Sequence, residues 1–90
     1  MWFVYLIQSK QDSSVYIGYT EHLKQRINEH NQGKTKSIKH KTPFKLIYFE
    51  TYCNKRLARK REIELKKNSF KKKELLTRLE IKNMVPSSNG

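Results

Sequence analysis

The sequence predicts an α+β fold: a small three-stranded antiparallel sheet flanked by about three helices. Two segments rich in aromatic and β-branched residues, 2–8 and 14–19, flank the turn-like sequence SKQDSS and are typical of a β-hairpin. A third such segment, 44–52, follows Pro43, which favours extended backbone in the residue before it. Charged stretches with helical spacing and capping residues lie between and after these strands. Strands and helices are therefore both expected, without the regular alternation of a parallel α/β fold.

Two tyrosines stand out in the predicted hairpin. Because successive side chains in a strand alternate between faces, Tyr5 shares a face with Phe3 and Ile7. Tyr16 shares a face with Gly18, which leaves open space beside it. We therefore expect the two tyrosines to be cross-strand neighbours.

Capping residues predict where the helices begin and end. Thr20 is a candidate N-cap for a first helix, EHLKQRINEHNQ, that ends at Gly33. Asn54 is a candidate N-cap for a second helix that runs to about Lys67. A third helix, for which Asn68 or Ser69 is the candidate N-cap, begins directly afterwards and carries leucines at core spacing.

Length and composition limit the class of protein. The 90 residues have room for one domain, which we place at 1–80, and residues 81–90 are expected to form a disordered tail. Cys53 is the only cysteine, which excludes an internal disulfide and is typical of a reducing compartment. The apolar N-terminal segment MWFVYLI is far shorter than the roughly 20 residues of a membrane span and lacks the features of a signal peptide. These observations predict a cytoplasmic protein with no membrane partner, and they leave its oligomeric state open.

The positive charge indicates a polyanionic partner. The chain has 20 Lys and Arg against 8 Asp and Glu, a net charge of +12 and a pI near 10.0. Such a surface attracts nucleic acid first and anionic membrane second, although a merely solvated charged face is the alternative. The basic residues are concentrated in two runs, from which we take as candidate nucleic-acid-binding residues Lys34, Lys36, Lys39, Lys41, Arg59, Arg61 and Lys66.

The first predicted helix carries polar residues where a core stripe is expected. The inward positions at helical spacing hold Leu23, Arg26, Ile27 and His30. A structural explanation exists for each polar member, because Arg26 could extend along the core edge with its charge in water and His30 could be hydrogen-bonded near the helix end. The alternative is that both side chains point into a functional site.

The second predicted helix adds an inward acid. At about 100° per residue, Glu62 lies close in angle to Ala58 and Leu65, whereas Glu64 points to the opposite side. A carboxylate on the apolar face has to be paired, bound to a metal or kept protonated. A salt bridge with Arg26 and a metal site both remain open at this stage.

Together these residue types suit phosphodiester hydrolysis. A carboxylate can hold a divalent ion such as Mg²⁺ that keeps most of its waters. An arginine offers a planar cationic fork to phosphate oxygens. A phenol can take a proton from water if its pKa falls from about 10, and we expect Arg26 and a metal to lower it.

Four motifs in order resemble the GIY-YIG nuclease superfamily, in its short single-domain bacterial form. FVY at 3–5 stands where the first tripeptide of the family lies, and YIG at 16–18 is the second tripeptide intact. LKQRINEHNQGK, TPFKLIYFETY and ARKREIELKK then follow in the order and spacing of the family. The resemblance covers nearly the whole chain and implies the same small three-stranded sheet with flanking helices.

The resemblance also implies a role for each candidate residue. The implied catalytic residues are Tyr5, Tyr16, Arg26, His30 and Glu62. Tyr5 matches the general base, Tyr16 a residue that positions water and phosphate, and Arg26 a phosphate contact. Glu62 matches the single acidic ligand of Mg²⁺ or Mn²⁺, and the part of His30 varies within the family.

The implied activity is metal-dependent hydrolysis of DNA with low sequence specificity and a preference for nicked, branched or flapped structures, as in repair or recombination; RNA is not excluded as a partner. Phe3 departs from the family pattern, which usually has Gly there, and Tyr19 stands where some relatives have a lysine. The alternatives are a non-catalytic nucleic-acid-binding module and an accessory subunit of a nucleic-acid enzyme. Binding alone would depend steeply on salt and not on Mg²⁺.

Overall fold

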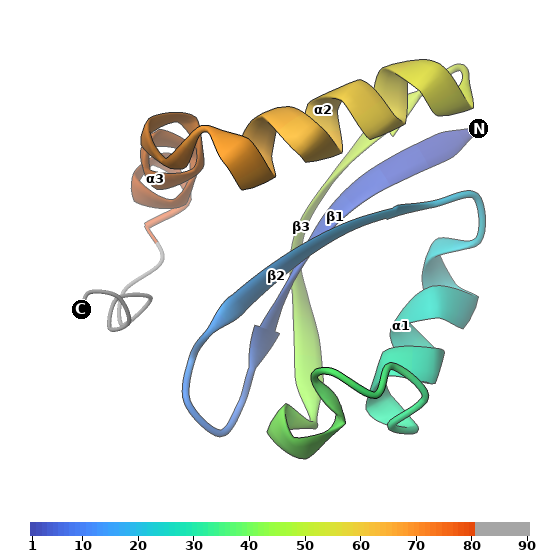
Figure 1. Ribbon diagram of the computed structural model, residues 1–90, viewed down its shortest axis with the longest axis vertical. Coiled ribbons are helices and arrows are strands. Elements are labelled where there is room, and N and C mark those ends of the chain that lie inside the picture. The colour runs from blue at the N-terminus through green and yellow to red at the C-terminus, as the bar shows by residue number, and fades with distance from the viewer. Residues whose placement is uncertain (81–90) are drawn as a thin grey trace.

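The computed structural model describes residues 1–80 and confirms the predicted α+β fold. Three antiparallel strands form one sheet in the order β2-β1-β3, so that β1 lies in the middle (Figure 1). The strands are β1 (Trp2–Ser9), β2 (Val15–Thr20) and β3 (Phe44–Tyr52). The helices are α1 (Leu23–Asn31), α2 (Lys55–Lys67) and α3 (Ser69–Arg78), with a short 3-10 helix η1 at Lys39–Lys41. The predicted tail lies outside the described residues.

Asparagine caps set the start of two helices as the sequence predicts. The side chain of Asn54 accepts a hydrogen bond from the Leu57 amide at 2.9 Å, and Asn68 accepts one from the Lys71 amide at 3.1 Å. These bonds satisfy backbone donors that the first helical turn leaves without partners.

The start of α1 differs from the expectation. Thr20 is still part of β2, and its hydroxyl accepts the amide of His22, the residue that precedes the helix. The threonine therefore closes the turn between strand and helix and does not cap α1 itself. At the other end, Gly33 has φ of 76°, the left-handed conformation expected just past a helix.

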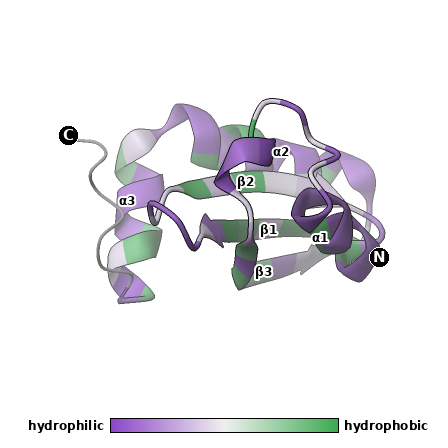
Figure 2. Ribbon diagram, turned by 90° about the horizontal axis from the view of Figure 1, so that it is seen from below, coloured by the Kyte–Doolittle hydropathy of each residue, from purple (hydrophilic) through white to green (hydrophobic). Residues whose placement is uncertain are grey.

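The central strand is buried on both faces, which explains its continuous apolar sequence. On one face Val4 and Leu6 pack with Ala58 and Leu65 of α2 and with the buried Leu75 and Leu76 of α3. Figure 2 shows the hydrophobic residues mainly along the strands, whereas the helices are largely hydrophilic. Burial of each large aliphatic side chain contributes about 1.5–3 kcal/mol.

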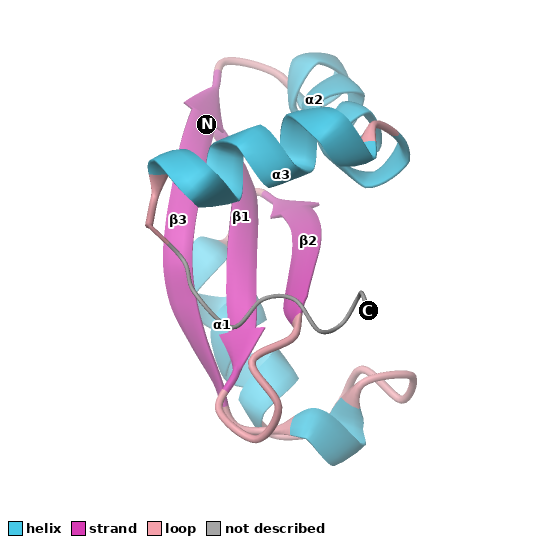
Figure 3. Ribbon diagram, turned by 90° about the vertical axis from the view of Figure 1, so that its left-hand side faces the viewer, coloured by secondary structure: helices cyan, strands magenta, loops and turns pink. Residues whose placement is uncertain are grey.

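The other face of the sheet is covered by α1. There the buried side chains of Tyr5, Ile7 and Phe44 form a second cluster with Leu23 and Ile27 of α1. Figure 3 shows α3 in front of the sheet and α1 behind it. Every second residue of β1, including Tyr5, therefore faces α1.

Two properties of the described part of the chain bear on its surroundings. Cys53 is free and exposed. None of the helices within residues 1–80 has the length and apolar character needed to cross a membrane.

Candidate functional site

The two tyrosines lie on the same face of the sheet but are not directly opposed. Tyr5 pairs with Gly18 across the β1–β2 ladder, and Tyr16 pairs with Ile7, so the tyrosines are diagonal neighbours. This corrects the expectation that Gly18 leaves space beside Tyr16. A Cβ atom built on Gly18 would lie 2.3 Å from the Tyr5 hydroxyl oxygen, which means that the Tyr5 ring occupies that space. Only glycine at position 18 leaves room for the ring.

The Tyr5 hydroxyl is held by a histidine from α1. Its oxygen lies 2.8 Å from Nε2 of His30. Both residues are buried, and the exposed fraction of the surface is 3% for Tyr5 and 5% for His30. The other ring nitrogen of His30, Nδ1, lies 3.0 Å from the hydroxyl of Thr35 in the segment after α1. Phe44 packs edge-on against the imidazole. The histidine is thus hydrogen-bonded at both nitrogens and fixed in orientation.

Burial dominates the electrostatics of this pair. It raises the pKa of Tyr5 above its ordinary value of 10.0, and the positive charge of Arg26 beside the phenol only partly opposes this effect. Arg26 thus acts in the expected direction, but burial outweighs it and the net shift of the Tyr5 pKa is upward. Burial, assisted by Arg26, also lowers the pKa of His30 below 6.5. Near pH 7 the protein therefore holds a protonated phenol against a neutral imidazole.

The two glutamates near the Tyr5–His30 pair, Glu29 and Glu62, have different ion-pair partners. Arg26 forms an ion pair with Glu29, one turn further along α1, at 3.1 Å between Nη1 and Oε1. Glu62 on α2 points inward as predicted, with 7% of the residue exposed, and its negative charge helps to raise the pKa of Tyr5. Its ion-pair partner is Lys66 at 2.9 Å, so the predicted alternative of a salt bridge with Arg26 does not occur.

One cleft of about 570 Å³ brings these side chains together. It opens beside β2 and is bounded by α1, by the segment that follows α1 and by the helices α2 and α3. Its lining includes all the side chains expected to be catalytic, namely Tyr5, Tyr16, Arg26, His30 and Glu62. Residues far apart in the sequence therefore meet around a single space.

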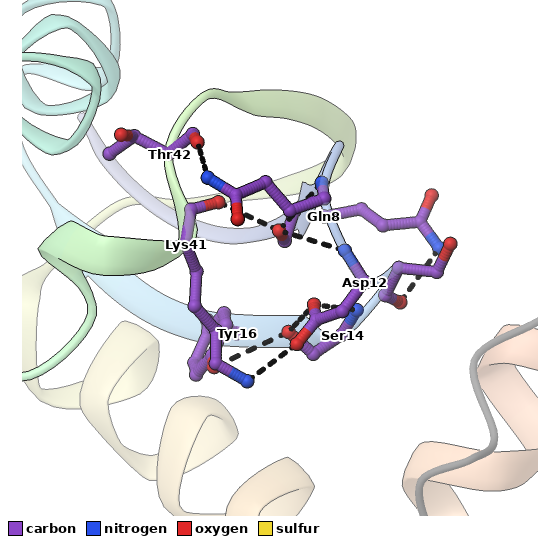
Figure 4. Close-up of polar contacts among 9 residues, drawn as sticks. Gln8, Asp12, Ser14, Tyr16, Lys41 and Thr42 are labelled. Atoms are coloured by element: carbon purple, nitrogen blue, oxygen red, sulfur yellow. Dashed lines mark hydrogen bonds and ion pairs between the residues drawn. The ribbon is translucent and has the colours of Figure 1, made fainter.

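Figure 4 shows a polar network beside Tyr16. The hydroxyl of Ser14 lies 3.3 Å from that of Tyr16 and donates to Asp12 at 2.6 Å, and Asp12 pairs with Lys41 at 2.6 Å. Asp12 raises the pKa of Lys41, and the neighbouring Tyr16 hydroxyl adds to the effect. An ammonium group thus stands next to the second phenol.

The candidate nucleic-acid-binding residues divide into two groups. Lys66 lines the cleft, and the exposed residues Lys34, Lys36 and Lys39 lie in the segment that borders it. Arg59 is exposed and stacks on Tyr19, with Nη1 3.1 Å from its hydroxyl.

Two basic residues instead serve contacts within the protein. Arg61 is bound by Glu50 and Glu64 and does not line the cleft. Lys41 is paired with Asp12 and lies next to Tyr16. Lys72, which the sequence did not single out, lines the cleft.

Sequence reasoning missed three side chains that support the tyrosines. Thr35, Ser14 and Asp12 lie in segments without regular periodicity, where no pattern indicates the direction of a side chain. The turn-forming sequence around Asp12 was the only signal, and it indicated a hairpin and not a site.

The donor set suits a hard cation that retains water. Within residues 1–80 no three His, Cys, Asp or Glu side chains lie close enough together to enclose a metal. Glu62 is the carboxylate of the cleft, and the phenols near it are also oxygen groups. Mg²⁺ is commonly bound through one or two carboxylates, with water and substrate phosphate completing its shell. A single buried carboxylate in an open polar cleft fits that requirement.

Comparisons with known proteins agree with the fold. A model of the GIY-YIG catalytic domain matches residues 1–74. A UPF0213 protein of Clostridium perfringens is 44% identical over 68 residues, which cover 74% of this chain and 72% of the relative. UPF0213 protein YazA of Bacillus subtilis is 43% identical over 74 residues, which cover 81% and 74%.

A solved structure extends this similarity to the whole chain. The solution NMR structure of a UPF0213 protein from Bacillus halodurans matches with a TM-score of 0.55 and 34% identity, and the match covers 100% of both chains. The chain therefore belongs to the GIY-YIG catalytic domain family, a family of nucleases.

Proposed function

We propose that the protein is a metal-dependent endonuclease that hydrolyses DNA phosphodiester bonds with low sequence specificity. The observation that carries the proposal is the meeting of the Tyr5–His30 pair, Arg26 and Glu62 around one cleft in a strongly basic domain. A domain that only binds nucleic acid gains nothing from a buried carboxylate there, because the carboxylate repels phosphate.

Tyr5 and His30 act as the proton acceptors in this proposal. The raised pKa of Tyr5 means that the phenol has to give up its own proton before it can take one from water. The neutral His30, 2.8 Å away, is placed to receive that proton at Nε2. The water proton then passes to the Tyr5 oxygen as the Tyr5 proton passes to the imidazole, and the hydroxide attacks phosphorus.

Arg26 and Tyr16 bind and orient the phosphate. The Arg26 guanidinium pairs with Glu29, yet about 38% of the side chain is exposed, so it can still be reached from the cleft. A planar guanidinium donates two parallel hydrogen bonds to phosphate oxygens, and these strengthen as negative charge develops in the transition state. Tyr16, next to the ammonium of Lys41, adds a hydroxyl for a phosphate oxygen or the attacking water.

Glu62 would hold the metal, and Lys66 would give way or turn to the phosphate. When bound, Mg²⁺ or Mn²⁺ supplies positive charge that stabilises the pentacovalent phosphate and the leaving oxygen. The ion pair with Lys66 compensates the charge of the buried carboxylate in the protein without a metal.

Low sequence specificity follows from the kinds of group in the cleft. Its ammonium, guanidinium and phenol groups recognise phosphate, which carries no sequence information. We therefore extend the proposal to substrates with a distorted backbone, namely nicked, branched or flapped DNA, in a repair or recombination role.

The test compares two carboxylates on the same helix. Glu62→Gln is expected to abolish nicking of branched DNA in Mg²⁺ while salt-sensitive DNA binding is kept or slightly strengthened, because one negative charge is removed. Glu64→Gln is the matched control, since Glu64 makes the same charge change but is bound by Arg61 and Lys71 outside the cleft. Both variants are measured by gel-based cleavage and by fluorescence anisotropy.

The assay includes a panel of nicked, branched, flapped and single-stranded DNA and RNA with Mg²⁺ and with Mn²⁺. Wild-type protein that binds but cleaves no member of the panel would overturn the proposal in favour of a binding module. Equal loss of cleavage in Glu62→Gln and Glu64→Gln would overturn the role of Glu62.

A further inference from the structure

His30 is hydrogen-bonded at both ring nitrogens, and the proposed function uses only one of these contacts. Nε2 meets the hydroxyl of Tyr5 at 2.8 Å, and Nδ1 meets the hydroxyl of Thr35 at 3.0 Å. Thr35 is half-buried at the edge of the cleft. The second contact therefore requires its own explanation.

Two arrangements of hydrogen atoms satisfy both contacts. A neutral imidazole has one N–H donor and one acceptor nitrogen, and each hydroxyl is able to donate or accept. In the first arrangement Tyr5 donates to Nε2, and Nδ1–H donates to Thr35. In the second, Thr35 donates to Nδ1, and Nε2–H donates to Tyr5. Only the first leaves Nε2 able to accept the Tyr5 proton.

The surroundings of the Tyr5 hydroxyl distinguish between the two arrangements. The neighbouring Arg26 has donors and no acceptor, so it cannot accept the hydrogen of that hydroxyl. In the second arrangement Nε2–H would donate to the Tyr5 oxygen. The Tyr5 hydrogen would then be left without an acceptor in a residue only 3% exposed, since His30 is the hydrogen-bond partner of this hydroxyl within the described residues. An unsatisfied buried donor costs about 1–3 kcal/mol.

We propose that Thr35 is a positioning residue that fixes His30 in the Nδ1–H tautomer, so that hydrogen bonds run in one direction from Tyr5 through His30 to Thr35. This inference rests on the proposed function for its role in catalysis, whereas the tautomer itself is a property of the unliganded protein. Thr35 does not touch the reacting atoms. It acts by keeping the imidazole proton on Nδ1, so that Nε2 has no hydrogen and can accept the proton of Tyr5.

The direction of the chain also suits the charge that forms during proton transfer. The Tyr5 O–H bond breaks, an Nε2–H bond forms, and the imidazole becomes a cation with a hydrogen on each nitrogen. The Thr35 oxygen already accepts from Nδ1–H, so this contact stays satisfied before and after the transfer. A donor at this position would be left facing another donor.

The principal test reads the tautomer directly by long-range ¹H–¹⁵N correlation NMR of the whole protein near pH 7.5. Wild-type His30 is expected to show a protonated Nδ1 and an unprotonated Nε2. His22, whose side chain is 71% exposed, serves as an internal control that samples solvent. A wild-type His30 with its hydrogen on Nε2 overturns the inference, and this outcome needs no variant that has to fold.

Two substitutions separate a hydroxyl contact from simple packing. Thr35→Val keeps the branched shape and removes the hydroxyl, and Thr35→Ser keeps the hydroxyl. We expect Thr35→Val to shift His30 toward a mixture of tautomers with His22 unchanged, and Thr35→Ser to retain the Nδ1–H form. An Nδ1–H signature that persists unchanged in Thr35→Val would show that Thr35 does not fix the tautomer.

Cleavage supplies a second readout with a distinct failure. Loss of the orienting partner of a functional histidine costs about 10- to 100-fold in activity. Thr35→Val is therefore expected to lower kcat by that factor with KM unchanged, and Thr35→Ser is expected to restore kcat. If the threonine served only the packing of the loop, kcat would fall in both variants, and this outcome would overturn the positioning role. A wild type that shows the Nδ1–H signature and cleaves nothing would refute the proposed function and leave the tautomer assignment standing.

Discussion

Two clusters in this small domain contain tyrosine, arginine and glutamate, and their tyrosines lie on opposite faces of the sheet. In one of them, Glu50 on β3 accepts hydrogen bonds from the hydroxyls of Tyr48 and Tyr52 at 2.7 and 2.6 Å. Arg61 of α2 completes it with a two-pronged contact at 2.9 and 3.0 Å. Four donors saturate the carboxylate, and the cluster ties β3 to α2.

The cleft cluster has the same residue types with unfilled bonding capacity. Glu62 has an exposed lysine as its ion-pair partner, and Arg26 pairs with Glu29 while part of its side chain stays exposed. The Tyr5 hydroxyl meets a neutral imidazole, not a carboxylate. The comparison shows that residue types alone do not identify a reactive site; a site also needs groups whose hydrogen-bonding capacity is left for a substrate.

The largest expected difference is between the variants Tyr5→Phe and Tyr52→Phe, each of which removes one tyrosine hydroxyl. Tyr5→Phe is expected to lower kcat by about 10²- to 10⁴-fold, the range for a general base. Tyr52→Phe removes a hydrogen bond to Glu50 and is expected to lower stability by about 1.5 kcal/mol without affecting cleavage. Single-turnover cleavage and urea unfolding of both variants check this pair. Equal activity of the two variants would contradict the assignment of Tyr5.

Gly18→Ala tests the space that the Tyr5 ring needs. The added Cβ would lie 2.3 Å from the Tyr5 hydroxyl oxygen, so the ring has to move away from His30. A misplacement of about 1 Å costs on the order of 100-fold in rate, and overpacking costs about 1–3 kcal/mol in stability.

The matched control for this substitution is Gly33→Ala. Gly33 has φ of 76°, and a Cβ atom built on it would lie 3.6 Å from Lys39 Cβ, so the change strains the backbone but leaves the Tyr5–His30 contact in place. It is expected to destabilise the protein with cleavage retained. A fully active Gly18→Ala would show that the position of the Tyr5 ring does not matter for the reaction.

Arginine-to-lysine changes compare the two guanidinium groups. Arg26→Lys keeps the charge and loses the fork, and loss of one charge-assisted hydrogen bond of about 1.5 kcal/mol corresponds to a roughly tenfold lower kcat. Arg61→Lys loses the two-pronged contact with Glu50 and is expected to lower stability instead. Cleavage kinetics and thermal unfolding separate the outcomes, and a tenfold loss of activity in Arg61→Lys would break the distinction.

The smallest expected effect is the pH dependence of the structural cluster. Arg61 and the two tyrosine hydroxyls outweigh burial and hold the pKa of Glu50 below its ordinary 4.5. A carboxylate with a lowered folded-state pKa stabilises the protein fully above its unfolded pKa, and this stabilisation is lost as the pH falls through the folded-state value. The stability difference between wild type and Glu50→Gln is therefore expected to shrink below pH 4.5 in urea unfolding measured across pH. A difference that stays constant to pH 3 would contradict this account.

Much of the framework could be predicted because it depends on local rules. Alternation placed Tyr5 on one face with Ile7 and Tyr16 on one face with Gly18, asparagine caps marked α2 and α3, and helical geometry separated the inward Glu62 from the outward Glu64. Each of these properties depends on neighbours within a few residues, so a single sequence contains them. This reasoning missed the start of α1 because Thr20 is the last residue of β2 and closes the turn that follows, so it does not cap the helix.

The composition and periodicity of the sequence by themselves determined the α+β fold, the basic surface and the set of side chains directed toward the cleft. Tertiary structure alone decided that the Tyr5 ring covers Gly18, that Arg26 pairs with Glu29 and Glu62 with Lys66, and that Thr35 reaches His30. It also decided the direction of the Tyr5 pKa shift, because burial outweighs the nearby cation. The physical reason is that register, helix docking and desolvation depend on how distant segments pack, and these are properties of the assembled fold.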